Sequence, residues 1–209
     1  MDRMFVSSVE KACVIALIEK GFESPRSRTR FIRLDNEFLG WVGLNRGNYS
    51  DYLQINPFIG LHCIPIMRLK SELAKEKYKE GDLASYSIHM GEIAPDVPQF
   101  IFNEQTDLAK EAGRLANEIF IHGVPWMKAR ANYEALTPML EAKIEMLGGF
   151  PEKYASALYF SGKQETAVQF VQERTDLFDP NYEGTYSLHE KFGKPFLEML
   201  DGEKGQKSC

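Results

Sequence analysis

The feature that most constrains this chain is a change in the spacing of its apolar residues. Between residues 29 and 61 the chain is rich in aromatic and β-branched side chains, whereas from residue 106 onward apolar residues recur at helical spacing. The strand-like segments cover residues 29–34, 38–44 and 52–61, and polar stretches suited to turns separate them. This pattern predicts three antiparallel strands joined in a meander.

Two further segments extend the predicted sheet. Residues 84–93 alternate loosely between apolar and polar, and residues 99–102 form a short run after a loop with two prolines. The sheet therefore has four or five strands. Pro57 lies within the third strand and has no backbone N–H to donate, so we expect that strand to lie at an edge of the sheet or to bulge there.

A helix precedes the predicted sheet. Ser7 and Glu10 have capping-box spacing, and Gly21 suits the left-handed position that ends a helix. Val14, Ile15 and Ile18 broaden the apolar face of this segment, so we expect the helix to be buried on more than one side.

Helices also follow the strands. An amphipathic segment at 66–78 predicts one helix between strands, and Gly123 with Pro125 predicts a break after the next. The other predicted helices cover residues 107–121, 133–147, 151–161, 163–178 and 187–200. Thr106 is the expected N-cap of the first of these, and Ser187 with Glu190 has capping-box spacing at the start of the last.

The expected fold class is thus α+β, with an antiparallel four- or five-stranded meander sheet covered by helices and an all-helical C-terminal extension. We expect an α+β domain over residues 1–147 and a helical extension over 148–209 packed on it. A single continuous domain remains open.

Composition narrows the class of protein. With 209 residues, 44% hydrophobic and 26% charged, the chain can bury a core, and its net charge of -5 argues against general nucleic-acid binding. No apolar run reaches the length of about 18 residues that spans a membrane. Three cysteines without a CxxC pair predict no disulfide framework, so we expect a cytoplasmic protein.

Charge is unevenly distributed along the sequence. Residues 1–80 hold 13 basic and 10 acidic side chains, whereas residues 81–209 hold 12 basic and 20 acidic. Within the acidic half, a cluster is formed by Glu173, Asp176, Asp179 and Glu183. This cluster is interpreted either as a solvated surface or as a docking face for a basic partner.

The sequence contains few recognisable catalytic or ligand-binding motifs. The four histidines are scattered, there is no HExxH, and neither a phosphate-binding loop nor a GxSxG motif is complete, so we assign no catalytic residue, no metal site and no cofactor. One alternative remains open, an unrecognised active site in which Cys63 acts with His62 or His89.

Several short segments carry a resemblance. These are Gly21-Phe22, Arg30-Phe31-Ile32-Arg33, Ile55 to Gly60 and Gly123-Val124-Pro125-Trp126. In this order they resemble uncharacterised bacterial α+β domains, some of which are immunity proteins of polymorphic or contact-dependent toxin systems, over about residues 5–147. Residues 157–167 also look like the turn of a tetratricopeptide-type helical hairpin.

The resemblance implies a bacterial protein-binding module of toxin–antitoxin type, with no catalytic residues to carry over. We therefore expect an immunity protein that binds and neutralises a cognate toxin domain, a basic one if the acidic cluster is the docking face. The alternatives are the enzyme near Cys63 and a helical adaptor protein. The sequence leaves the oligomeric state open.

Overall fold

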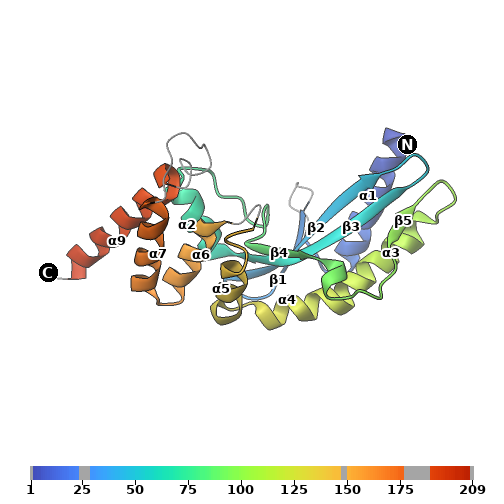
Figure 1. Cartoon of the computed structure of the whole chain (residues 1–209). Helices are drawn as coiled ribbons and strands as arrows, with labels where there is room; N and C mark the ends of the chain where they lie inside the picture. Colours follow the sequence, from blue (N-terminus) through green and yellow to red (C-terminus); the bar gives the residue numbers. More distant parts are fainter. Residues whose placement is uncertain (1, 24–28, 147–149, 177–188, 208–209) are drawn as a thin grey trace. The chain divides into compact units, whose positions relative to one another are not determined.

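The computed structural model describes residues 2–23, 29–146, 150–176 and 189–207. The chain divides into two compact units. We call Met1–Cys63 with Glu80–Ala131 the sheet unit, and Ile64–Lys79 with Asn132–Cys209 the helical unit. Figure 1 shows their elements.

The sheet unit contains one antiparallel sheet. Its strands are β1 (Thr29–Arg33), β2 (Phe38–Asn48), β3 (Leu53–Cys63), β4 (Tyr86–His89) and β5 (Phe100–Phe102). They lie in the order β1-β2-β3-β4, and β5 also pairs with β3. The predicted meander and the α+β class are thereby confirmed.

The prediction that Pro57 marks an edge strand is wrong, because β3 lies inside the sheet. One side of β3 pairs with β2 along its whole length, with Pro57 opposite Leu44. The other side is shared, since β5 pairs with residues 53–55 and β4 with residues 58–61. Pro57 falls between these two short partners, at a position where no ladder donor is required.

Three helices lie alongside the sheet, namely α1 (Arg3–Glu19), α3 (Leu108–Glu118) and α4 (Val124–Arg130). The contact with α4 is close, because a Cβ on Gly40 of β2 would lie 2.8 Å from the sulfur of Met127. Likewise, a Cβ on Gly123 would lie 3.3 Å from Ile59 of β3. Glycine at these positions lets helix and strand backbones approach each other.

Helix α1 begins earlier than its sequence predicts. Its N-cap is Asp2, so Ser7 lies inside the helix and the expected capping box does not form. The end is as predicted, since Gly21 follows with φ +87°. Ile15 and Ile18 are about half exposed, at 48% and 49%, so the expectation of burial on a second side is wrong for these two residues.

The expected break at Gly123 is also wrong. A π-helical segment, η2 (Ile119–Gly123), connects α3 to α4 without leaving the helical conformation. Pro125 lies in the first turn of α4, where a missing N–H is tolerated. At the start of α3 the N-cap is Asp107 rather than Thr106, since the Asp107 carboxylate accepts from the backbone N–H of Lys110.

The helical unit is built around α6 (Pro151–Phe160), which contacts three other helices. These are α2 (Ile64–Leu73), α5 (Tyr133–Glu141) and α7 (Gln164–Asp176). The π-helical η3 (His189–Gly193) and α9 (Lys194–Lys207) complete the described part of this unit. Residues 153–158 of α6 are all buried, as expected for a helix surrounded by others.

The two units do not follow the expected boundary at residue 147. Helix α2 groups with the C-terminal helices, and so does α5. Helix α2 is also shorter than the predicted 66–78, because the chain leaves the helix after Leu73 and Lys75 adopts φ 54°. The capping box expected at Ser187 lies outside the described residues.

Candidate functional site

Only half of the predicted acidic cluster is described by the structure. Glu173 and Asp176 lie on the last turn of α7, and both are exposed. Glu173 accepts a hydrogen bond of 2.8 Å from the side-chain amide of Gln169. Asp179 and Glu183 fall outside the described residues.

The charge difference along the sequence does not separate the two units. Helix α2 and the segment after it carry five basic and two acidic residues into the helical unit. That unit consequently holds 13 basic and 15 acidic side chains, and the sheet unit holds 12 and 15. Local arrangement, rather than the net charge of a unit, must therefore distinguish any docking face.

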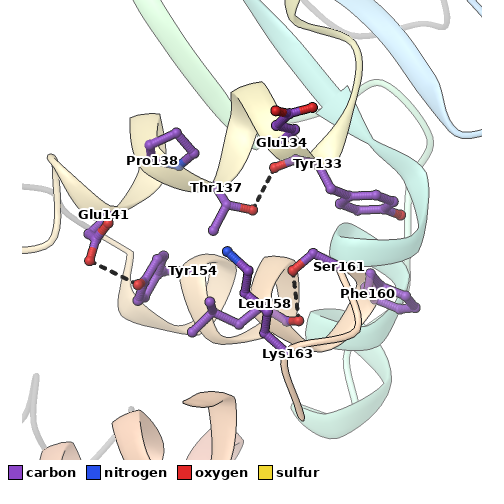
Figure 2. Close-up of a pocket in the computed structure, with 10 residues that line it drawn as sticks. All are labelled: Tyr133, Glu134, Thr137, Pro138, Glu141, Tyr154, Leu158, Phe160, Ser161 and Lys163. Atoms are coloured by element: carbon purple, nitrogen blue, oxygen red, sulfur yellow. Dashed lines mark hydrogen bonds between the residues drawn. The ribbon is translucent and has the colours of Figure 1, made fainter. Parts of the chain in front are cut away.

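A groove on the helical unit is lined by both charged and aromatic side chains (Figure 2). It has a volume of about 610 Å³. Its lining comes from α5, α6 and the turn that follows α6, namely Tyr133, Glu134, Thr137, Pro138, Glu141, Tyr154, Leu158, Phe160, Ser161 and Lys163. We refer to it as the α5–α6 groove.

Helical spacing explains how these residues converge. Residues 134, 137, 138 and 141 share one face of α5, and residues 154, 158 and 161 share one face of α6 and its end. Gly162 ends α6 with φ +80°, and the N–H of Lys163 bonds back to the carbonyl of Leu158 at 2.9 Å. This glycine-based turn returns the chain over the groove.

Part of the lining of the α5–α6 groove is aromatic and apolar. The rings of Tyr133 and Phe160 stack with centroids 6.1 Å apart and an angle of 20° between planes. Leu158 and Tyr154 are buried. Such rigid aromatic surface provides contact area at a low cost in conformational entropy.

The rim carries charges of both signs. The carboxylates of Glu134 and Glu141 are on exposed residues, as is the amino group of Lys163. Figure 2 shows that amino group extending into the groove toward Thr137. With two carboxylates and one ammonium group, the rim has a net charge of -1.

One buried hydroxyl holds a rim carboxylate in place. Tyr154 donates a hydrogen bond of 3.0 Å to Oε1 of Glu141. Burial of the phenol, together with this hydrogen bond and the carboxylate's charge, raises the pKa of Tyr154 to about 12. The hydroxyl is therefore protonated at neutral pH and remains a donor, which orients Glu141 at the rim.

A second group of charged residues lies at the start of α6, away from the groove lining. Lys153 is 5% exposed, and its Nζ lies 3.8 Å from the ring centroid of Phe150. Burial lowers the pKa of Lys153 to about 8, although the carboxylate of Glu152 acts in the opposite direction. Oε1 of Glu152 lies 3.9 Å from Nζ of Lys70, and burial raises the pKa of Glu152.

The residues of the alternative active site are not brought together. Cys63 and His62 are both fully buried. His89 pairs with Phe58, which is five residues from Cys63 along β3, so about 16 Å separates the two positions at the usual strand rise. The structure therefore forms no Cys63–His89 dyad.

His62 and His89 also have structural roles. Nδ1 of His62 lies 2.6 Å from the carbonyl oxygen of Leu83, and Nε2 accepts from the N–H of Gly81 at 3.5 Å. These contacts suit a neutral imidazole with its proton on Nδ1. Nδ1 of His89 accepts from the N–H of Gly91 and caps the short helix that follows β4.

The groove was not predicted from the sequence. The available signal was the density of aromatic residues in two consecutive predicted helices, at 133, 154, 159 and 160. Their convergence depends on how α5 packs on α6, which spacing within one helix cannot reveal.

The described residues provide neither a metal site nor a membrane-spanning helix, and the chain has no match among known proteins. In the described ranges, no group of three or more His, Cys, Asp and Glu side chains could hold a metal ion. None of the helices in the part of the chain that is described has the length and apolar character needed to cross a membrane. No protein-family model, curated protein or solved structure matches this chain.

Proposed function

We propose that this chain is a protein-binding module that receives a basic segment of a partner in the α5–α6 groove. The observation that supports this proposal is the pair of exposed carboxylates, Glu134 and Glu141, in a groove that stacked aromatic rings also line. More narrowly, we propose an immunity protein that binds and neutralises a cognate toxin domain. The narrower function rests on the resemblance of the sequence segments to immunity proteins.

The aromatic part of the groove lining would supply most of the affinity. Binding energy in protein interfaces is concentrated in a few residues, with tyrosine among the most frequent, that pack in desolvated pockets. Tyr133 and Phe160 are each partly exposed, so a partner side chain can still cover them. An aliphatic or aromatic side chain flanked by arginine or lysine is the chemistry that this surface fits.

The rim would supply selectivity. Carboxylates at the edge of an interface accelerate encounter with a basic partner and disfavour an acidic one. Glu141 is held by Tyr154, so the entropy lost on forming a new ion pair is reduced at this position. A toxin domain with a basic surface, such as a nuclease, is the partner class that this arrangement favours.

The experiment uses the product of the reading frame adjacent to the gene for this chain, carrying an inactivating substitution. Its affinity for the wild type is compared with that of the Glu134→Gln/Glu141→Gln double variant by isothermal titration calorimetry. Glutamine retains the acceptor for Tyr154, so the fold is kept while two charges are removed. We expect affinity to fall about tenfold or more and to become less sensitive to salt.

A matched control tests the other acidic face. The Glu173→Gln/Asp176→Asn variant removes the same charge from the end of α7 and should change affinity less than about twofold. The reverse result, with only the α7 variant weakened, would contradict the groove as the docking site. Growth protection is measured separately, because a complex that forms without protecting cells from the active toxin would refute immunity but not binding.

A further inference from the structure

The outer face of α1 is apolar although nothing in the described structure covers it. Val9, Cys13 and Leu17 face the core and are fully buried. On the opposite side, Ile15 and Ile18 are 48% and 49% exposed. Two β-branched side chains exposed within one turn of a helix form a surface suited to contact with another protein.

Two charged residues frame this apolar surface symmetrically. Lys11 precedes Ile15 by four residues and Glu19 follows it by four, so all three lie on one stripe of the helix. Both are exposed, and neither has an ion-pair partner among the described residues. In contrast, the neighbouring Glu10 pairs with Arg46 at 2.5 Å.

Glu19 is also placed unfavourably in a single copy of the chain. It lies in the last turn of α1, which contains no basic residue, and the C-cap Lys20 directs its ammonium group to Oδ1 of Asn117 at 3.2 Å. The helix macrodipole places partial negative charge at that end, so a carboxylate there is destabilising unless a cation lies nearby. A cation supplied from outside the helix would remove this disadvantage.

We propose that α1 is the contact between two copies of this chain, which pack antiparallel about a two-fold axis at Ile15. In that arrangement Ile15 meets Ile15 of the second copy. Lys11 lies level with Glu19 of the second copy, and the same pair forms again at the other end, as two-fold symmetry requires. At 1.5 Å per residue the two ion pairs are about 12 Å apart along the helix.

The charges exclude the parallel arrangement and leave this one. Parallel copies in register would bring Lys11 against Lys11 and Glu19 against Glu19, and both contacts are repulsive. The antiparallel arrangement also places the small Ala12 at the level of Ile18 of the second copy. One pair of 17-residue helices is a modest contact, so we expect a weak dimer that forms at protein concentrations on the order of 100 µM.

Charge reversal tests the proposal through its symmetry. Sedimentation equilibrium is measured for the wild type, Lys11→Glu, Glu19→Lys and the Lys11→Glu/Glu19→Lys double variant. Each single variant creates two like-charge contacts and should weaken the dimer about tenfold or more. The double variant restores two opposite-charge pairs and should recover dimerisation to within about threefold of the wild type.

Controls separate the contact from the folding of the chain. Lys128→Glu reverses an exposed charge on α4 and should leave self-association unchanged. Circular dichroism checks that every variant keeps its helix content. A wild type that stays monomeric at about 100 µM would overturn the proposal, and so would a dimer that the double variant fails to restore.

Discussion

The buried ammonium group of Lys153 gives the most quantitative prediction. Burial lowers its pKa from 10.5 to about 8, so the folded helical unit holds this proton more weakly than the unfolded chain does. One pKa unit corresponds to about 1.4 kcal/mol, so keeping Lys153 charged costs the folded state about 3 kcal/mol near neutral pH. Replacing it with methionine removes this titration from the folded state while keeping an unbranched chain.

The sign of the pH dependence follows from linkage. Between about pH 8 and pH 10.5 the unfolded chain retains the proton of Lys153 and the folded chain has lost it, so this group makes stability rise with pH. The stability of the wild type relative to Lys153→Met should therefore increase by about 2 kcal/mol between pH 7 and about pH 9.5. Other groups that titrate in this range, such as the Cys13 thiol, cancel in the difference.

The assay is urea denaturation followed by far-ultraviolet circular dichroism at both pH values. Lys194→Met replaces an exposed lysine of α9 and serves as the matched control, because it should track the wild type at both pH values. A Lys153→Met variant whose stability difference from the wild type does not change with pH would refute the assignment of a weakly held proton to Lys153.

Three further predictions concern the sheet unit. Gly81→Ala should destabilise the chain by about 2 kcal/mol, because φ is +71° there and the new Cβ would lie 2.3 Å from the Phe31 ring. Gly113 lies in open space on α3, so Gly113→Ala should stabilise the chain by about 1 kcal/mol. Thermal melts measure both changes. Cys63 should react with a thiol reagent only after unfolding, because it is fully buried, and rapid labelling of the native protein would contradict this. Asp107→Ala removes the N-cap of α3 and should cost about 1 kcal/mol in urea denaturation, a loss that Asp107→Asn should largely avoid.

The sheet could be predicted because its signals are local. Alternation and turn residues mark β1, β2 and β3 within the sequence of each strand, and the structure has all three near their predicted bounds. The position of β3 inside the sheet could not be predicted from Pro57. It depends on two later segments, β4 and β5, that share one side of β3 and leave a gap at the proline.

Which helices pack together was harder to predict, because that also depends on contacts between segments far apart in the sequence. The sequence places α2 between strands, yet its apolar face packs on α6, more than 80 residues later. That contact changes both the division into units and the charge of each unit. Helix ends were also missed where the signal was ambiguous, since both Ser7 and Asp2 are good N-cap residues. Only the structure shows that the helix begins after Asp2, whose side chain makes no capping hydrogen bond.

The candidate site was the least predictable part. Glu134, Glu141 and Lys163 are ordinary surface residues when each is considered within its own segment. They come to line one groove only because α5 packs on α6 and because the turn at Gly162 brings Lys163 back over the groove. Sequence alone directed attention to the acidic cluster around Glu173, which is conspicuous because its charges are adjacent along the chain.

The central claim, that the α5–α6 groove is the docking site, is tested most directly by hydrogen exchange of the complex. The backbone amides of this chain are followed by mass spectrometry with and without the product of the adjacent reading frame. We predict slower exchange in residues 133–141 and 158–163 upon binding, with little change over the end of α7. Protection confined to α7, with the groove segments unchanged in a complex that forms, would contradict the account.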